Sequence, residues 1–361
     1  MKRTLLWAAM VILVVVVSVG GYIWVSMGQP LYQPGMVAKQ KGLSAPLQPP
    51  VQKEAGSYWN VEKGIKLFHF NQGKGKRHVL FIHGGPGIPP MRPMMGLAPL
   101  EKDYTFHFYH QRGCGKSTRP VQAFSSSNFY SNMLTLNRKL GLAAQIADIE
   151  RIRRILKQDK IYLIGHSFGA FLAAMYAAEF PQRVRGLILL APADVLVFPV
   201  PGGDLFQTIR KALPKAKLKE YDAFLKRYFA FSKIFRNTEK QLAALNNKFG
   251  EFYRLAAKSK GFAVPKSQPQ QTGGWMTQAM YFGMGREHDF QPALAKVKAF
   301  TCVVHGGKDL QHENAGRRYV KALSEIGVRF AVMKEAGHFM WLDKPVTFSR
   351  LMKVLLDRPK W

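Results

Sequence analysis

Residues 161–170, with the sequence IYLIGHSFGA, decide the fold of this chain. Four apolar or aromatic residues predict a short buried strand, and the alanine-rich run after the second glycine predicts a helix. Between them lies Gly-x-Ser-x-Gly, which in a strand–turn–helix context is typical of a nucleophile elbow. Gly165 and Gly169 remove side chains that would clash in so sharp a turn. We therefore predict that Ser167 is a nucleophile at the carboxyl end of a strand; the alternative is a glycine-bearing turn with an idle serine.

A serine hydroxyl needs a base to take its proton, and the base needs a third group to hold its tautomer. In hydrolases with this elbow, the chain order is Ser, then Asp or Glu, then His. An apolar, strand-like run begins at residue 300 and leads through Gly-Gly-Lys to Asp309, and a second strand-like run at 328–333 is followed by His338. Parallel strands present their carboxyl ends on one edge of a sheet. The sequence thus predicts a Ser167–His338–Asp309 triad.

Other residues compete for these roles. Asp309 could instead be a turn aspartate that bonds its own backbone, as is common after Gly-Gly. Asp194 is a rival acid after the predicted strand 185–190, and Glu335 and Asp343 are weaker rivals. Four further histidines are expected in strand-end loops, where they would line the site without acting as its base (His83, His110, His166, His305).

A glycine-rich loop upstream supplies candidate donors for the oxyanion of a tetrahedral intermediate. The predicted strand 78–82 runs directly into His-Gly-Gly-Pro-Gly at 83–87. Glycines let backbone N–H groups point into a site without side chains in the way. We predict the N–H groups of Gly85 and Phe168 as the oxyanion hole; a plain tight turn is the alternative.

Together these motifs resemble the proline iminopeptidase family of α/β-hydrolases. The resemblance rests on His-Gly-Gly-Pro-Gly at 83–87, Gln-Arg-Gly-Cys-Gly-Lys-Ser at 111–117, the elbow, Asp309 and His338, and it covers roughly residues 58–357. It implies a serine triad that removes an N-terminal proline, or another small residue, from peptides. Esterases, lipases and acyltransferases are relatives in the wider superfamily, so a carboxylesterase or lipase acting near a membrane is the alternative function.

The chain departs from the family's pattern at several points. His110 stands where the second motif usually begins with Asp, and the elbow is Gly-His-Ser-Phe-Gly instead of Gly-Gly-Ser-Trp-Gly. The family's lid glutamates hold the substrate's free amine, and Glu251 and Glu287 are the candidates here. Trp275 opens a Met- and aromatic-rich strip that forms either a substrate pocket or lid core. A buried lid carboxylate near Ser167 would favour a peptide substrate, and an apolar pocket without acids would favour an ester.

The expected fold class is α/β, with a mostly parallel central sheet flanked by helices. The strand–helix alternation stops near residue 192 and resumes at 300, which predicts a helical lid inserted at 192–299 between two parts of the core, 57–191 and 300–361. Residues 28–56 are rich in Pro, Gly and Gln and predict an extended linker.

The N-terminus predicts membrane attachment. Lys2 and Arg3 precede an almost continuously apolar run at 5–25, about the ~20 residues that a membrane span requires. A cleaved signal peptide is the alternative, but no Ala-x-Ala cleavage site follows. We expect an uncleaved signal anchor at 1–27, with the catalytic domain on the periplasmic side of a bacterial inner membrane.

The chain is strongly basic, with 53 Lys and Arg against 22 Asp and Glu and a net charge of +31. Residues 207–266 alone carry 15 basic and four acidic residues, a net charge of +11. No helix-turn-helix, zinc-finger spacing or aromatic-basic RNA signature is present, so nucleic acid is not expected as a partner. Anionic lipid, an acidic substrate and a merely solvated basic surface all fit this charge.

No His, Cys or Asp cluster has metal-ligand spacing, so neither a metal nor another cofactor is expected. The sequence therefore predicts a membrane-tethered serine hydrolase that acts on a small peptide or ester. A catalytically silent hydrolase fold that serves as a scaffold is the alternative from another functional class.

Overall fold

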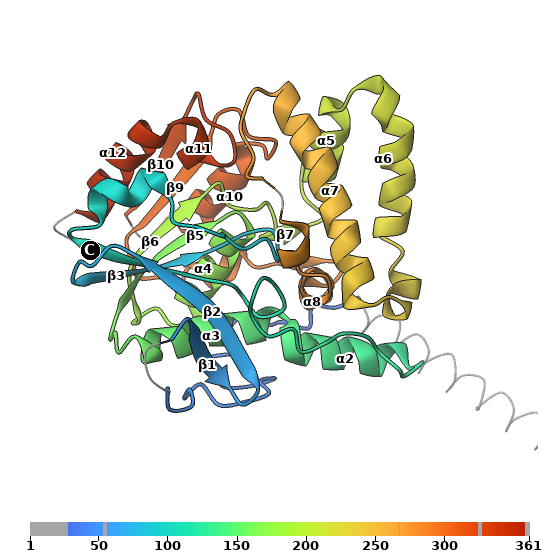
Figure 1. Cartoon of the computed structure of the whole chain (residues 1–361), viewed down its shortest axis with the longest axis horizontal. Helices are drawn as coiled ribbons and strands as arrows, with labels where there is room; N and C mark the ends of the chain where they lie inside the picture. Colours follow the sequence, from blue (N-terminus) through green and yellow to red (C-terminus); the bar gives the residue numbers. More distant parts are fainter. Residues whose placement is uncertain (1–27, 53–55, 267, 324–326, 358–361) are drawn as a thin grey trace, which may run out of the picture.

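A mixed sheet of eight strands forms the centre of the molecule, which is described here from a computed structural model covering residues 28–52, 56–266, 268–323 and 327–357 (Figure 1). Its spatial order is β1-β2-β4-β3-β5-β6-β9-β10. The pairs β1–β2 and β2–β4 are antiparallel, and every other neighbouring pair is parallel. The strands are β1 (Tyr58–Glu62), β2 (Ile65–Gln72), β3 (Arg77–Ile82), β4 (Tyr104–Tyr109), β5 (Ile161–His166), β6 (Val184–Leu190), β9 (Thr301–Gly306) and β10 (Val328–Met333).

Alternate residues of the central strands enter two separate cores. In β5, Leu163 joins the larger core and Ile164 the smaller one; Leu189 and Ile188 of β6 divide in the same way. This alternation follows from the two-residue period of a strand. The larger core lies under α2 (Phe129–Leu140), α3 (Leu142–Ile155), α4 (Phe168–Glu179) and α10 (Asn314–Ala322), and the smaller under η1 (Met95–Leu100), α11 (Met340–Asp343) and α12 (Pro345–Leu356).

One side of α3 carries an apolar stripe that lies in the core. Ile146, Ile149 and Ile152 are fully buried against the sheet. Each such side chain contributes about 1.5–3 kcal/mol through burial alone. The polar side of this helix is not simply solvated, since Arg151 is also buried and donates to Asp148 and to the backbone of the N-terminal segment.

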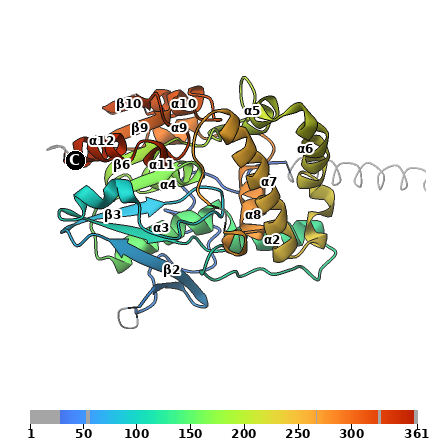
Figure 2. The same cartoon turned by 45° about the horizontal axis from the view of Figure 1, so that its top comes forward.

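Between β6 and β9 the chain leaves the sheet and builds a mainly helical unit beside it, in the region predicted as a lid (Figure 2). The carboxyl end of β3 points toward this unit. Its interior is aromatic, with Phe252 of α7 packed between Tyr221 and Phe224 of α6. The elements are β7 (Val197–Phe198), α5 (Leu205–Ala212), α6 (Lys215–Tyr228), η2 (Phe231–Arg236), α7 (Glu239–Ser259), η3 (Pro269–Gln271), α8 (Trp275–Met284), β8 (His288–Asp289) and α9 (Gln291–Leu294).

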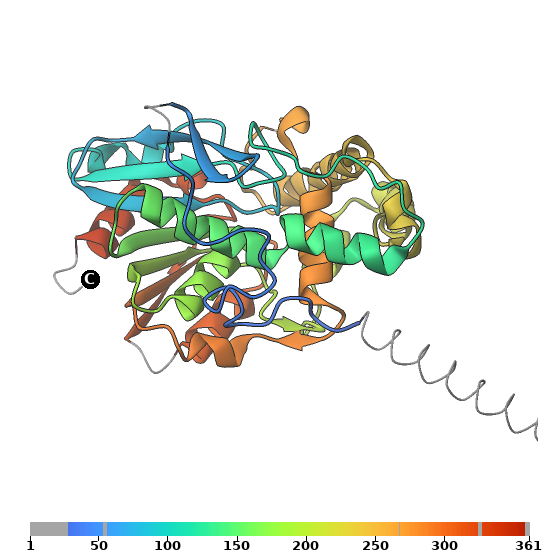
Figure 3. The same cartoon turned by 90° about the horizontal axis from the view of Figure 1, so that it is seen from below.

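Residues 28–52, which were expected to form an extended linker, instead pack onto the core as a strap (Figure 3). Tyr32 and Val37 are buried, and the carboxylate of Glu179 at the end of α4 gathers the strap around itself. It accepts hydrogen bonds from the Tyr32 hydroxyl at 2.9 Å and from the N–H groups of Gly35 at 2.7 Å and Ala38 at 3.0 Å. Composition suggested a linker because the stabilising partner lies about 140 positions away in the sequence.

The structure contradicts the predicted localisation in a bacterial inner membrane. Among the residues that the structure describes, no helix is both long and apolar enough to cross a membrane. The apolar run at 5–25, on which the prediction of a signal anchor rests, lies outside the described residues. The assignment of a single-pass protein with a periplasmic domain is therefore not retained.

Replacing Glu179 with Gln should lower the free energy of unfolding by about 2–4 kcal/mol. An amide can present only one acceptor oxygen, so one set of buried donors would lose its partner. Urea denaturation of Glu179→Gln measures the change. The control Glu251→Gln removes an exposed carboxylate and should change stability by less than about 0.5 kcal/mol. Equal effects of both substitutions would contradict the anchoring role of Glu179.

Candidate active site

Ser167 occupies a strained backbone conformation at the turn between β5 and α4. Its φ of 56° and ψ of −122° lie where residues other than glycine are rarely found. The surrounding backbone holds it there: its N–H donates to the carbonyl of Leu190 at 2.9 Å, and its carbonyl accepts from the N–H of Ala193 at 3.1 Å. Such strain persists only where the neighbouring structure imposes it, and it is concentrated at functional sites.

The two glycines of the elbow are required by close backbone packing. A Cβ at Gly169 would lie 2.1 Å from the carbonyl oxygen of Ile82, and one at Gly165 would lie 2.5 Å from the Cα of Ala170. Gly84 belongs to the same cluster, because a Cβ there would lie 2.6 Å from the Cβ of Ser167 and 3.2 Å from its Oγ. The glycine-rich loop after β3 thus presses directly against the serine.

The structure brings Asp309 and His338 together. His338 Nδ1 lies 2.7 Å from Asp309 Oδ2, and both side chains are buried. The other oxygen, Oδ1, accepts the N–H of Gln311 at 3.0 Å, which fixes the plane of the carboxylate. An acceptor on Nδ1 favours the tautomer with a proton there and leaves Nε2 with a lone pair. Asp309 follows β9 and His338 follows β10, at the same edge of the parallel sheet where Ser167 follows β5.

The rival acids are engaged elsewhere. Asp194 pairs with Arg318, whose Nε lies 2.7 Å from Oδ1. Glu335 is exposed and pairs with Lys308 at 2.7 Å. Asp343 accepts the N–H groups of Gly337 and Ala263 and so braces the loop that carries His338.

Gln311 is a site residue that the sequence analysis missed. Its Nε2 lies 3.4 Å from His338 Nδ1 and 3.3 Å from the carbonyl of Ala191. The backbone carbonyl of Gln311 lies 3.1 Å from Nε2 of His305, so His305 supports the loop after β9 that carries Asp309. His166 supports the base from the other side, with its Nε2 2.9 Å from the carbonyl of His338. Burial holds the pKa of His166 well below its usual value, so the ring is neutral there.

The backbone around the serine leaves two candidate oxyanion donors free. Among the described residues, no carbonyl or side chain accepts the N–H of Gly85 or of Phe168. Phe168 is the first residue of α4, where helical N–H groups have no partner within the helix. Gly85 has a φ of 121°, which an L-residue with a side chain rarely adopts.

The motif at 111–117 holds the glycine-rich loop in place. The Gln111 side chain donates to the carbonyl of His83 at 2.8 Å, and its backbone N–H donates to His83 Nε2 at 3.1 Å. On the other side of the ring, Nδ1–H donates to the carbonyl of Gly84 at 2.9 Å. Both bonds require a neutral imidazole, and burial lowers the pKa of His83 to about 3. His83 is thus a structural connector between the two loops.

The departure at His110 has a structural explanation. His110 Nε2 lies 3.0 Å from the carbonyl of Pro90, and its Nδ1 accepts the N–H of Lys116 at 3.0 Å. The neutral ring therefore bridges the loop after β3 and the loop after β4. Burial lowers the pKa of His110 to about 4, which keeps the ring neutral near pH 7.

The predicted substrate-binding residues lie elsewhere. Glu251 is exposed on α7 and pairs with Lys248 at 2.9 Å, and Glu287 is exposed in the loop before β8. Trp275 is buried in lid core, stacked on Phe235 and edge-on to Phe124 at 5.0 Å. Glu251 and Glu287 therefore lie at the surface and Trp275 lies in the core of the lid, so none of the three is placed to bind a substrate in this structure.

Two other lid residues lie close to the site. Tyr253 of α7 packs edge-on to His338, with ring centroids 6.0 Å apart, and its buried hydroxyl has no partner among the described residues. Glu239 begins α7 and is buried; its carboxylate accepts the N–H groups of Gly274 at 2.8 Å and Trp275 at 2.6 Å and pairs with Arg119. Tyr253 and Glu251 lie two positions apart on one helix and so face opposite ways, a difference that the lid sequence alone did not resolve.

The comparisons with known proteins agree with this geometry. Residues 77–345 match the family described as alpha/beta hydrolase fold. This chain belongs to that family. The candidate residues Ser167, Asp309 and His338 all fall within the matched residues.

Individual relatives confirm the resemblance to proline iminopeptidases. The chain is 26% identical to the proline iminopeptidase of Saccharolobus solfataricus over 317 residues, which cover 83% of this chain and 93% of that protein. It is 34% identical over 128 residues to the proline iminopeptidase of Heyndrickxia coagulans, a match that spans 36% of this chain and 39% of that protein. Among solved structures, an esterase from Exiguobacterium antarcticum superposes with a TM-score of 0.57 at 21% identity, covering 84% of this chain and all of that one, and shows the shared fold.

The buried neutral histidines should make the fold sensitive to acid. Burial lowers the pKa of both His83 and His107 to about 3, below the value of about 6.5 expected in the unfolded chain. As the pH falls below about 6.5, these histidines bind protons in the unfolded state but not in the folded state, so the folded state loses stability. Between pH 7 and pH 5 we expect each of these histidines to lower the free energy of unfolding by about 2 kcal/mol. Urea denaturation at several pH values measures this change. In His107→Asn the loss of stability between pH 7 and pH 5 should be smaller by about 2 kcal/mol, because one of several buried histidines is removed; an unchanged loss would contradict the assignment.

Replacing Gly84 with Ala should impair catalysis far more than folding. The new methyl group would displace Ser167 or the loop, and a shift of about 1 Å in a reacting group can lower the rate about 100-fold. Steady-state kinetics on an aryl ester and thermal melting would separate the two effects. Gly250→Ala is the control, because a Cβ at this partly exposed position of α7 meets only the end of the Arg254 side chain, at 3.5 Å. Full activity in Gly84→Ala would contradict the contact between this loop and the serine.

Proposed function

We propose that this chain is a serine hydrolase that acts through an acyl-enzyme, with Ser167 as nucleophile, His338 as base and Asp309 as the group that orients the base. The observation that carries the proposal is the 2.7 Å contact between His338 Nδ1 and Asp309 Oδ2 at the sheet edge where the strained serine lies. A carboxylate on Nδ1 stabilises the imidazolium that forms when Nε2 accepts the serine proton.

The reaction then proceeds in two halves. Ser167 Oγ attacks the carbonyl carbon while its proton passes to His338 Nε2, and the N–H groups of Gly85 and Phe168 stabilise the resulting oxyanion. The tetrahedral intermediate collapses, the leaving group takes the proton from Nε2, and an ester on Ser167 remains. Water attacks this ester, gives a proton to His338 and releases the carboxylic acid and the free serine.

The geometry best supports an ester, or another acyl compound without a free amine beside the scissile bond. Recognition of a substrate ammonium requires a carboxylate available near the serine. Among the described acidic residues between 192 and 299, Glu239 is the one that is buried, and its oxygens are already occupied by Arg119 and by two N–H groups of α8. Glu251 and Glu287 are exposed and offer no such site.

An aminopeptidase acting on the N-terminal residue of small peptides is the second candidate. The similarity to the proline iminopeptidase of Saccharolobus solfataricus extends over 93% of that protein and favours it. In either case residues 192–299 act as the lid, because Tyr253 and Phe262 of this region contact the loop that carries His338.

Comparing two substrates tests this proposal. The full chain should hydrolyse a short-chain aryl ester in preference to a proline arylamide with a free amine. Ser167→Ala should reduce the rate at least about 10⁴-fold, because the nucleophile itself is removed, and should abolish labelling by a fluorophosphonate. The control Ser232→Ala changes an exposed serine of η2 and should retain full activity.

Each other result has a definite meaning. Preference for the arylamide, lost on acetylation of its amine, would replace the ester by a peptide substrate and leave the serine mechanism intact. Folded protein that hydrolyses neither substrate and does not react with the fluorophosphonate would contradict the serine hydrolase. Such a result would favour a catalytically silent hydrolase fold that serves as a scaffold.

A further inference from the structure

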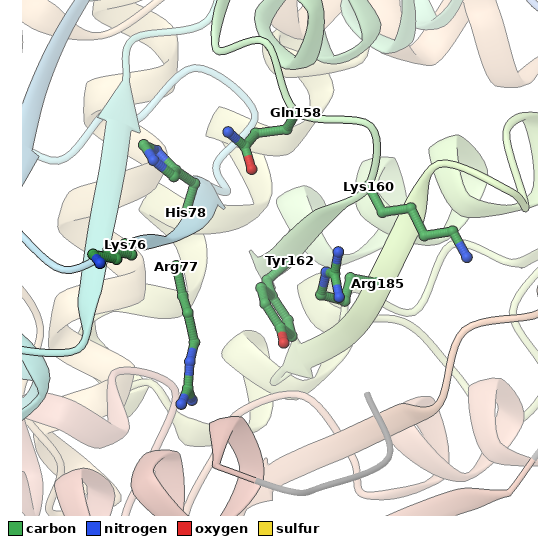
Figure 4. Close-up of a pocket in the computed structure, with 7 residues that line it drawn as sticks. All are labelled: Lys76, Arg77, His78, Gln158, Lys160, Tyr162 and Arg185. Atoms are coloured by element: carbon green, nitrogen blue, oxygen red, sulfur yellow. The ribbon is translucent and has the colours of Figure 1, made fainter.

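A basic pocket lies at the edge of the sheet opposite to the candidate active site (Figure 4). It has a volume of about 250 Å³. Its wall is formed by residues at the starts of three neighbouring parallel strands and by the turn that precedes β5. The lining residues are Lys76, Arg77, His78, Gln158, Lys160, Tyr162 and Arg185.

The topology of the sheet brings these residues together. Strands β3, β5 and β6 are adjacent and parallel, so their amino ends meet at one edge. Tyr162 of β5 lies opposite Val79 of β3 and Gly186 of β6 in the strand register. Ser167 follows the other end of β5, and a six-residue strand at about 3.3 Å per residue separates the two sites by about 20 Å. The pocket is therefore distinct from the site of acyl transfer.

Four cationic side chains line this pocket, and no lining residue is acidic. Arg77 pairs with Asp357 at 3.3 Å and contacts the Tyr104 hydroxyl. Lys76, Lys160 and Arg185 form no ion pair within the described part of the chain; Arg185 lies over the Tyr162 ring at 5.9 Å. Like charges held on one rigid edge repel one another, and an anion placed among them would relieve this repulsion.

The pocket differs from the other basic region of the molecule. On the lid, Arg210 pairs with Asp222, and Lys217 and Lys248 both pair with Glu220. There the net positive charge is interrupted by carboxylates at the surface. At the sheet edge Arg77 pairs with a carboxylate, whereas Lys76, Lys160 and Arg185, which line the same pocket, have no carboxylate partner among the described residues.

We infer that this pocket binds a multiply charged anion of the phosphate class. Lysine ammonium groups act on phosphate as point charges, and the guanidinium of Arg185 can donate two parallel hydrogen bonds to its oxygens. His78 is not counted among the anion ligands, because its Nδ1 is engaged by His107 Nε2 at 2.8 Å and burial lowers its pKa, so it adds no fifth charge.

The chemistry fits a phosphate group on a small molecule or on a phosphate polymer. Calorimetric titration of the full chain with inorganic pyrophosphate, and separately with long-chain polyphosphate, tests both sources. We expect saturable binding that weakens as salt is added, because the lysines and Arg185 are exposed. Tighter binding of pyrophosphate per site would assign a small ligand, and tighter binding of polyphosphate would assign a polymer.

The double variant Lys160→Gln/Arg185→Gln should bind at least tenfold more weakly. Lys226→Gln/Lys240→Gln is the matched control, because it also removes two positive charges from exposed positions, here on α6 and α7. Unchanged melting temperatures in the absence of ligand show that both variants fold, independently of any hydrolase activity.

Two outcomes would overturn the inference. Equal weakening in both double variants would mean that binding reflects overall charge and not this pocket. No saturable binding of either phosphate compound to the unaltered chain at low salt would mean that the pocket is not a phosphate site.

Discussion

The close approach of three backbone segments around Ser167 is the constraint on which the site depends. The end of β3, the turn after β5 and the start of α4 touch so tightly that Gly84, Gly165 and Gly169 have no room for a Cβ. The pairing of β5 with β3 and β6 sets these contacts, since strand register determines where each strand ends. Strain at Ser167 is therefore offset by the hydrogen bonds of a whole sheet. A loose loop could not hold a serine in that conformation.

A second layer of buried polar groups supports this packing. Arg112 is fully buried and donates to both oxygens of Asp148 at 2.6 Å, and Glu62 of β1 accepts from the same guanidinium at 3.0 Å. Removing one partner of such a network leaves an uncompensated buried charge and typically costs about 3–5 kcal/mol. Because Gln111 precedes Arg112 directly, this anchor also fixes the residue that holds the glycine-rich loop through His83. The buried ionic network around Arg112 thus helps to position the uncharged glycine-rich loop after β3.

Local patterns predicted the parts of the molecule whose interactions are local. Strand β10 at Val328–Met333 begins and ends where the sequence analysis predicted a strand, because its hydrophobic period and its turn residues lie within the segment itself. The elbow was recognisable for the same reason. The pairing of Asp309 with His338 followed from chain order together with the edge rule for parallel strands.

Features that depend on distant partners were not predictable in this way. The strap at 28–52 contains nothing that indicates Glu179, and its proline- and glycine-rich composition is equally suited to a free linker. The sequence predicted a helical lid but not which helix face meets the site: Glu251 was a candidate, whereas Tyr253 is the α7 side chain that contacts His338. Trp275 belongs to a strip rich in Met and aromatic residues, and such a composition does not reveal whether the strip faces substrate or core.

Glu239 links the lid to the glycine-rich loop that carries Gly85, and this link bears on the proposed choice of substrate. Its carboxylate caps the first turn of α8, where the helix dipole favours a negative charge. The residue just before that turn, Gly273, donates its N–H to the carbonyl of Gly87 at 2.9 Å, and Thr277 donates to the carbonyl of Pro86. For Glu239 to bind a substrate ammonium, it would have to release Arg119 or the helix terminus, and either change would loosen the contact between α8 and the loop that carries Gly85. The buried acid of this lid is thus engaged by Arg119 and by the start of α8, and it holds α8 where that helix contacts the loop that carries Gly85.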